Sequence, residues 1–278
     1  MASTGSGLLH CQRDAYALEG VSKVVACIRS ESPDSSTYHV TLEDSVLYPE
    51  GGGQPWDLGS VNGIDVEKVV KGTGSNKEIV VDLKQPVEVG AEVVCKVDWN
   101  RRYDFMQQHT AQHLFSAVAD KLFKAETTGW ALGAEYVSVD LSTAPSFLTA
   151  SQIEEIETET NRMIASGSAV NWKIYSKDQI VNHDPTNADS NSPAELNLLR
   201  GGPKGAALEL DELRMVHIDG LDLNPCGGTH LRGLSEINLL KVMGFEKDAG
   251  RGCVRVRFVA GQRALNYFKE SLQRESSL

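Results

Sequence analysis

The sequence lacks the features of a membrane protein, of a secreted protein and of a basic protein that binds nucleic acid through its overall charge. In its 278 residues, no uncharged apolar run approaches the length of roughly 18 residues that a membrane-spanning helix needs. The N-terminus has no basic cluster followed by an apolar run, so we expect no signal peptide and a cytoplasmic location. Lys and Arg total 27 against 38 Asp and Glu, a net charge of −11. Because bulk attraction to nucleic acid needs a basic protein, any RNA must be bound locally.

The sequence also has few cysteines, and their spacing suggests no disulfide pairs. An odd number of cysteines at scattered positions argues against a disulfide framework and favours free thiols or metal ligands. The five are Cys11, Cys27, Cys95, Cys226 and Cys253. With 41% hydrophobic and 23% charged residues, the composition is that of a globular protein and excludes collagen or a disordered tail.

The length suggests two domains, and the pattern changes near residue 100. Short apolar, β-branched segments before that point predict a small β-barrel over residues 1–99, with the run 51-GGGQP-55 interrupting it. The expected strands are 21–28, 37–47, 64–70, 79–83 and 91–97.

Residues 100–278 predict an α+β domain with helices on an antiparallel sheet. Thr149 and Gln152 have the spacing of a capping box that opens one of the helices. The expected helices are 103–123, 150–165 and 262–273, and the expected strands are 129–141, 214–218, 237–243 and 254–259. A hairpin turn is expected at 246–252, and the polar segment 178–206 reads as a long insert.

Two short motifs carry groups that bind metals. His109 and His113 are four apart in a predicted helix, so both imidazoles can face one ion. Cys226 and His230 are also four apart, separated by two glycines and a threonine that let the chain turn around a ligand. Either motif alone is weak, but together they supply three His and one Cys, a set suited to Zn²⁺.

These motifs resemble the editing region of alanyl-tRNA synthetase and its free-standing AlaX-type relatives. The likeness rests on 109-HTAQHL-114, on 226-CGGTHL-231 and on the upstream 51-GGGQP-55, which occur in the family's order. The larger AlaX class also carries an N-terminal barrel, so the resemblance extends to nearly the whole chain.

The resemblance implies a zinc-dependent deacylase that clears mischarged tRNA(Ala). The substrate would be seryl-tRNA(Ala), with glycyl-tRNA(Ala) left open as a second one. His109, His113, Cys226 and His230 would then hold one Zn²⁺ per chain. Thr127 or Thr128 would read the serine hydroxyl, while Gly51, Gly52, Gly53 and Gln54 would lie at the substrate pocket.

The chemistry leaves a question about the metal. Zinc can polarise a carbonyl or acidify a bound water, yet four protein ligands make a closed site. Either one ligand is exchangeable or the metal mainly positions the substrate's amino group. Gln112, between the two helix histidines, is a candidate for orienting water.

RNA contacts are expected at isolated arginines. Arg101 precedes the metal helix, and Arg255 and Arg257 share strand parity, so that they face one side. Solvated surface arginines would look the same in sequence.

Two alternatives stay open beside the hydrolase. One is a non-catalytic binding or chaperone-type protein that keeps zinc in the same fold. The other is a piece of a longer synthetase, although no ATP-handling segment is present in these residues.

Overall fold

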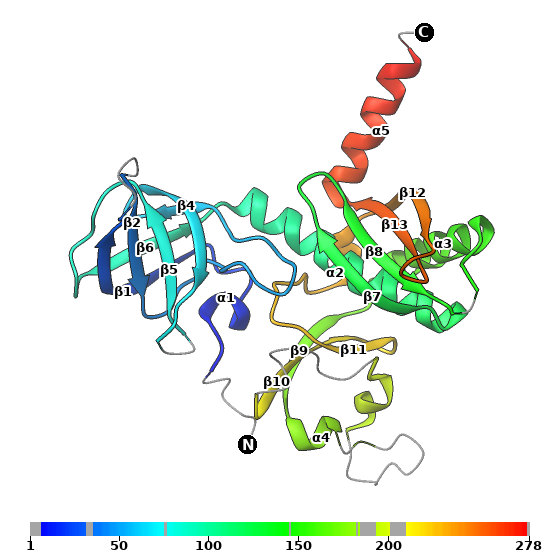
Figure 1. Cartoon of the computed structure of the whole chain (residues 1–278), viewed down its shortest axis with the longest axis horizontal. Helices are drawn as coiled ribbons and strands as arrows, with labels where there is room; N and C mark the ends of the chain where they lie inside the picture. The colour runs from blue at the N-terminus through cyan, green and yellow to red at the C-terminus, as the bar shows by residue number, and fades with distance from the viewer. Residues whose placement is uncertain are drawn as a thin grey trace. The chain divides into compact units, whose positions relative to one another are not determined.

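The structure is a computed structural model that describes residues 7–31, 36–74, 77–144, 146–181, 183, 193–200 and 210–276. The chain divides into two compact units, Met1–Met106 and Gln107–Leu278 (Figure 1). The division falls inside helix α2 (Trp99–Phe123), a little after the domain boundary expected from the sequence. The boundary at residue 99 stays a prediction.

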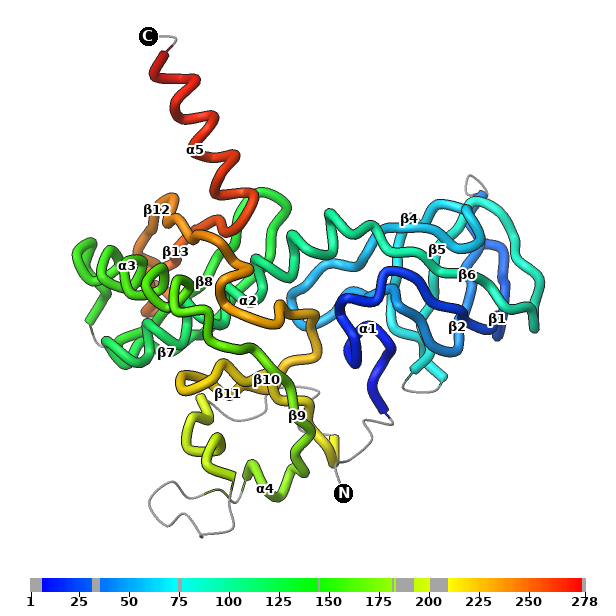
Figure 2. The backbone as a smooth tube through the Cα atoms, turned by 180° about the vertical axis from the view of Figure 1, so that it is seen from behind, coloured from blue at the N-terminus to red at the C-terminus, as the bar shows by residue number. Residues whose placement is uncertain are grey.

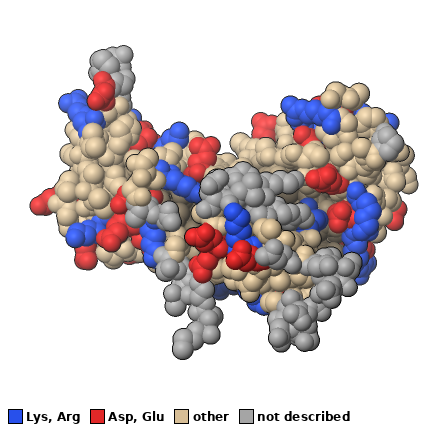
Figure 3. Space-filling view, turned by 60° about the horizontal axis from the view of Figure 1, so that its bottom comes forward, with Lys and Arg blue, Asp and Glu red and all other residues tan. Residues whose placement is uncertain are grey.

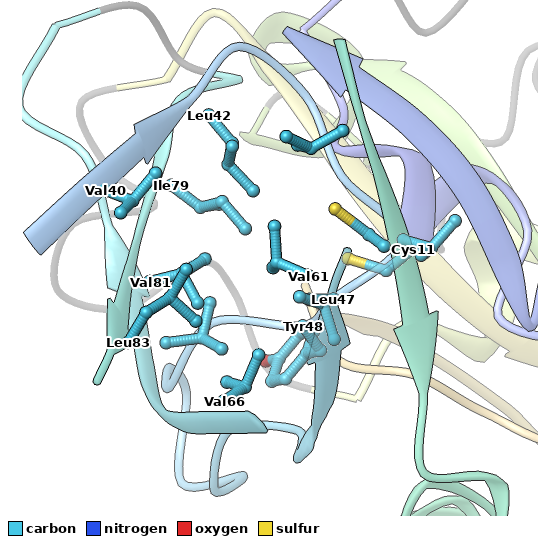
Figure 4. Packing of buried hydrophobic residues seen from close by; sticks show 14 of the residues in the cluster. Cys11, Val40, Leu42, Leu47, Tyr48, Val61, Val66, Ile79, Val81 and Leu83 are labelled. Atoms are coloured by element: carbon cyan, nitrogen blue, oxygen red, sulfur yellow. The ribbon is translucent and has the colours of Figure 1, made fainter. Parts of the chain in front are cut away.

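The first unit contains a closed antiparallel barrel with the strand order β1-β2-β5-β4-β3-β6. Its strands are β1 (Glu19–Arg29), β2 (Tyr38–Leu42), β3 (Gly59–Val61), β4 (Ile64–Lys71), β5 (Ile79–Leu83) and β6 (Glu92–Val97), preceded by the short helix α1 (His10–Arg13). Alternate residues of β5 point inward, and Ile79, Val81 and Leu83 are fully buried (Figure 4). The predicted barrel is confirmed.

A buried ion pair fixes the start of α2 within this first unit. Arg102 is fully buried and its Nε donates to Asp57 Oδ1 at 3.0 Å. Its two terminal nitrogens also donate to the backbone oxygens of Ala15, at 2.8 Å, and Val46, at 2.6 Å. Asp57 Oδ2 accepts from the Tyr48 amide at 2.6 Å, so both charges have hydrogen-bond partners.

In the part of the second unit that the structure describes, the strands form two antiparallel sheets. The four-stranded sheet has the order β12-β13-β8-β7, and the three-stranded sheet has the order β11-β10-β9. The strands are β7 (Glu126–Leu132), β8 (Val137–Ser142), β9 (Val170–Ser176), β10 (Glu212–Ile218), β11 (Asp222–Pro225), β12 (Leu240–Asp248) and β13 (Cys253–Ala260). The helices besides α2 are α3 (Ala150–Ser166), α4 (Lys177–Val181), α5 (Gly261–Glu275) and the 3-10 turns η1 (Ala194–Leu198) and η3 (Leu234–Ile237). This arrangement confirms the α+β class.

Helices α2 and α3 lie on one face of the four-stranded sheet (Figures 1 and 2). The rings of Phe115 in α2 and Phe258 in β13 pack with centroids 5.1 Å apart. The capping box of α3 is present as predicted, with the Gln152 amide donating to Thr149 Oγ1 at 3.3 Å. Among the described residues, no helix is long and apolar enough to cross a membrane.

Some elements differ from the sequence prediction. The expected strand 129–141 is a hairpin of β7 and β8, closed by the Gly133 amide donating to the Tyr136 oxygen at 3.0 Å. The expected strand 237–243 begins only at Leu240, because η3 precedes it and Asn238 adopts a φ of +66°. Strands β3, β9 and β11 were not predicted. Of the polar segment 178–206, part forms α4 and η1, and most of the rest lies outside the described residues.

Candidate metal centre

Helix α2 presents His109 and His113 inside the second unit. Residues 107–119 of the helix are buried on every face, so the polar side chains there need partners from the protein. Gln108 finds them in β13: its amide donates to the Ala260 oxygen at 2.9 Å and accepts from the Ala260 nitrogen at 3.0 Å. This pair of bonds fixes the rotation of the helix, and with it the direction of His109.

The loop after β11 presents Cys226 and His230. Arg214 of β10 holds this loop, since its Nη1 donates to the oxygens of Cys226, at 2.7 Å, and Gly228, at 3.1 Å. The Gly228 amide in turn donates to Cys226 Sγ at 3.3 Å. The thiol is therefore held by the backbone of its own loop.

The four side chains converge. One ligand atom from each of His109, His113, Cys226 and His230 lies within 4.8 Å of the others. Cys226 Sγ is 3.4 Å from His109 Nε2 and 3.2 Å from His230 Nε2. Ligand atoms of a tetrahedral zinc site lie roughly 3.3–3.6 Å apart, as follows from its bond lengths of about 2.0–2.3 Å. The two sulfur–nitrogen distances are close to this spacing, the other separations are at most 4.8 Å, and the donor set suits zinc, so the predicted cluster of four side chains forms.

The protonation of the cluster also suits a metal. Burial, with the nearby Arg214 charge, lowers the pKa of His109 to about 3. Burial, then the charge of His109, lowers the pKa of both His113 and His230 well below the ordinary value. All three imidazoles are therefore neutral at pH 7 and have a lone pair for a metal. Burial raises the pKa of the Cys226 thiol, so binding a metal would release its proton.

One ligand has a hydrogen-bond partner on its far side. His230 Nδ1 lies 3.3 Å from Thr110 Oγ1, and the same oxygen accepts from the Leu231 amide at 3.1 Å. Because a hydroxyl oxygen has two lone pairs, it can accept a second bond from His230 Nδ1–H and leave Nε2 free to face Cys226. Thr110 had no signal in the sequence beyond its place between the two histidines.

Strand β7 runs beside the cluster and carries the two candidate threonines. Its Trp130 ring lies 5.0 Å from that of His109, between centroids. A bulge between Thr127 and Gly129 places the two threonines differently. Thr128 is exposed and its hydroxyl donates to the Asp140 oxygen at 3.3 Å, whereas Thr127 Oγ1 is buried and, within the described chain, has no hydrogen-bond partner.

Gln112 lies in α2 between the histidines. Its Nε2 donates to Ser116 Oγ at 3.0 Å, and its Oε1 is buried with no partner among the residues described. The amide is therefore oriented by Ser116, one turn further along the helix. Its predicted role toward water stays a prediction.

The two arginines of β13 face one side, as expected, while Val256 between them is buried. Arg255 forms a two-pronged ion pair with Asp140, directly opposite in β8, with distances of 2.7 and 2.8 Å. Arg257 is 3.7 Å from a carboxylate oxygen of Glu246. Both guanidinium groups already have acidic neighbours, and their predicted contact with RNA stays a prediction.

The glycine-rich segment belongs to the first unit. Gly51 and Gln54 exchange two backbone hydrogen bonds of 3.1 Å, and Gly52 and Gly53 between them have φ of +56° and +80°. Glycine suits both positions, because other residues rarely adopt this conformation. Arg101 donates from Nε to the Trp56 oxygen at 3.0 Å. That these residues contribute to the substrate pocket stays a prediction.

Comparison with known proteins shows what this chain is similar to. Residues 213–257 match the family described as the threonyl and alanyl tRNA synthetase second additional domain. The match spans most of β10, all of β11, the loop with Cys226 and His230, and β12 into β13.

Similarity to whole proteins is more specific. The chain is 36% identical over 279 residues to the alanyl-tRNA editing protein Aarsd1-B of Xenopus laevis, covering 97% of this chain and 62% of the relative. It is 37% identical over 277 residues to Aarsd1 of Mus musculus (96% and 62%) and 33% identical over 266 residues to AlaX-L of Pyrococcus horikoshii (94% and 60%). The resemblance to alanyl-tRNA editing proteins is confirmed, and the chain spans about three fifths of the length of these relatives.

Proposed function

We propose that this chain is a zinc-dependent hydrolase that removes the amino acid from mischarged tRNA(Ala). The observation that carries the proposal is the convergence of His109, His113, Cys226 and His230 on one point in a chain similar to alanyl-tRNA editing proteins. Three neutral imidazoles and one thiolate would hold the ion, which would supply Lewis acidity beside the ester.

The chain's own residues shape what the site accepts. Thr127 is the better candidate for reading a serine hydroxyl, because its buried oxygen has no hydrogen-bond partner among the described residues and could bond a substrate. Thr128 is the weaker candidate, since its hydroxyl is exposed and already donates to the Asp140 oxygen.

This arrangement supports selectivity against the correct amino acid. Alanine has no hydroxyl, so an alanyl ester would not gain the hydrogen bond to Thr127 Oγ1 that a seryl ester gains, and the difference favours serine. Glycine gains nothing from this contact and would enter because it is smaller than alanine.

Binding of tRNA would depend on local contacts. On the face drawn in Figure 3, Lys and Arg side chains are interspersed with Asp and Glu, in line with the net charge of −11. A net negative charge gives RNA no long-range attraction, so binding would need contacts at particular residues. A phosphate at Arg255 would compete with Asp140, which already pairs with its guanidinium at 2.7 and 2.8 Å.

A non-catalytic zinc protein is the second candidate. It is favoured by the closed set of four protein ligands, which is typical of structural zinc. The two candidates predict the same metal content and differ only in the hydrolysis of the ester.

The deciding experiment charges tRNA(Ala) with serine and measures free serine released by the purified chain. The hydrolase predicts release that Cys226→Ala abolishes and Cys27→Ala, a matched change of a half-buried thiol in β1, leaves intact. A protein that binds zinc with the expected stoichiometry but releases no serine would support the second candidate.

A further inference from the structure

Asp222, the first residue of β11, lies behind the metal cluster and is 1% exposed. Its Oδ2 is 4.0 Å from His113 Nδ1, whereas the other two imidazoles each turn the Nε2 atom toward Cys226 Sγ. His113 Nδ1 is itself buried and has no hydrogen-bond partner within the described residues. A buried ring nitrogen thus faces a buried carboxylate at 4.0 Å, so the two groups must approach by roughly 1 Å to form a hydrogen bond.

The carboxylate is held by two neighbours. Arg200 donates from Nε to Oδ1 at 2.9 Å and from Nη2 to Oδ2 at 3.3 Å. Asn224, two residues along β11, donates from Nδ2 to both oxygens at 2.9 and 2.8 Å. These bonds hold the carboxylate and aim it, because both of its oxygens meet donors, while burial raises the pKa of the Asp222 carboxyl above its ordinary value.

The chemistry of the ring explains why such an acceptor is useful. A neutral imidazole carries its proton on one nitrogen and offers a lone pair on the other. Binding a metal through Nε2 therefore requires the proton on Nδ1, and an acceptor beside Nδ1 favours that tautomer. His230 has Thr110 in this place, 3.3 Å from its Nδ1. Asp222 is the carboxylate on the Nδ1 side of His113, at the longer distance of 4.0 Å.

We propose that Asp222 is a positioning residue of the metal centre, accepting a hydrogen bond from His113 Nδ1–H and so holding the tautomer whose Nε2 binds the ion. Arg200 and Asn224 position the carboxylate in turn. The proposal rests on the zinc-dependent function proposed above, but its test does not depend on hydrolysis.

The alternative is a purely structural role. The Arg200 amide donates to the Leu223 oxygen at 3.1 Å, and Leu199 forms a β-bridge with Leu223. Asp222 could therefore serve only to attach the segment around Arg200 to β11. In that case its loss would lower the stability of the protein without changing the tautomer of His113.

The first test is the zinc affinity of Asp222→Asn, measured by competition with a chelator of known affinity. The asparagine amide has the same size as the carboxylate, but its NH₂ group would replace one acceptor oxygen and face the donors of Arg200 and Asn224. We expect zinc affinity to fall by about 10- to 100-fold, the usual effect of losing such an outer partner, and the absorption bands of the cobalt-substituted protein to change. Glu157→Gln is the matched control, since Glu157 is a half-buried carboxylate of the same unit that pairs with Lys241 at 2.7 Å. It should leave zinc affinity unchanged.

The second test uses the unmodified protein and so holds even if Asp222→Asn does not fold. Nitrogen-15 NMR of labelled histidines, with His113 assigned from a His113→Gln variant, reports which ring nitrogen carries the proton. The proposal predicts a proton on Nδ1 in both the metal-free and the zinc-loaded protein. A proton on Nε2 in the metal-free protein, or zinc affinity unchanged in a folded Asp222→Asn, would overturn it. Failure to release serine, by contrast, would count only against the hydrolase.

Discussion

Replacing Thr127 by Val tests the serine-reading role most sharply. Valine keeps the shape of threonine and removes the buried hydroxyl, which in the free protein has no hydrogen-bond partner among the described residues. The change should therefore leave the free energy of unfolding unchanged or raise it, because an unsatisfied buried polar group is removed. Zinc content should be unaffected, since the hydroxyl belongs to none of the four ligands.

The expected loss appears only with a serine substrate. In the complex, the serine hydroxyl would be left unpaired, at a cost of about 1–3 kcal/mol, or roughly five- to 150-fold in kcat/KM. Hydrolysis of glycyl-tRNA(Ala), which offers no side-chain hydroxyl, should change far less. The assay compares the serine-to-glycine ratio of kcat/KM for the variant and the parent.

Thr128→Val is the matched control on the neighbouring residue. It removes the exposed hydroxyl that donates to the Asp140 oxygen at 3.3 Å, so the protein should lose at most about 1 kcal/mol of stability and keep the parent ratio. If Thr127→Val keeps that ratio while Thr128→Val loses it, Thr128 reads the hydroxyl. A ratio unchanged in both would refute the reasoning from the unpaired oxygen.

Three further outcomes follow from the structure. Cys226→Ala removes the only anionic ligand and should abolish stoichiometric zinc in metal analysis, whereas Cys27→Ala should retain it. In metal-free protein, burial lowers the pKa of His109 from 6.5 to about 3. Between pH 3 and pH 6.5, His109 is therefore protonated in the unfolded chain and neutral in the folded one. The free energy of unfolding should therefore fall as pH drops below 6.5, by about 1.4 kcal/mol per pH unit for this residue, in urea titrations. Arg102→Met leaves Asp57 as a buried charge without its ion-pair partner and should destabilise the protein by roughly 3–5 kcal/mol in the same assay; a loss below about 1 kcal/mol would contradict that account.

The parts that sequence predicted well are those with local signals. His109 and His113 share a helix face by spacing alone, and Cys226 and His230 are close in the chain, so each half of the cluster is readable. The capping box at Thr149 is likewise a local pattern. The short apolar, β-branched run at residues 79–83 is another local signal, and it forms strand β5.

The parts that it missed depend on contacts distant in sequence. Asp222 and Arg214 are charged residues in strands, and nothing local shows that they are buried behind His113 or under the loop of Cys226. Strand β3 has three residues, too few for a periodic pattern. Strand parity predicts that Arg255 and Arg257 face the same side of β13. The pairing of Arg255 with Asp140 could not be predicted, since cross-strand partners depend on which strands become neighbours.

The measurement that tests the central claim most directly is the release of free serine from seryl-tRNA(Ala) by the purified chain, followed through chelation and return of zinc. The account predicts release by protein with one zinc per chain, loss of release after the chelator, and recovery when zinc is added back. Release that continues at the same rate in protein shown to be free of metal would contradict a zinc-dependent hydrolase. No release by the zinc-loaded protein would contradict the hydrolase itself.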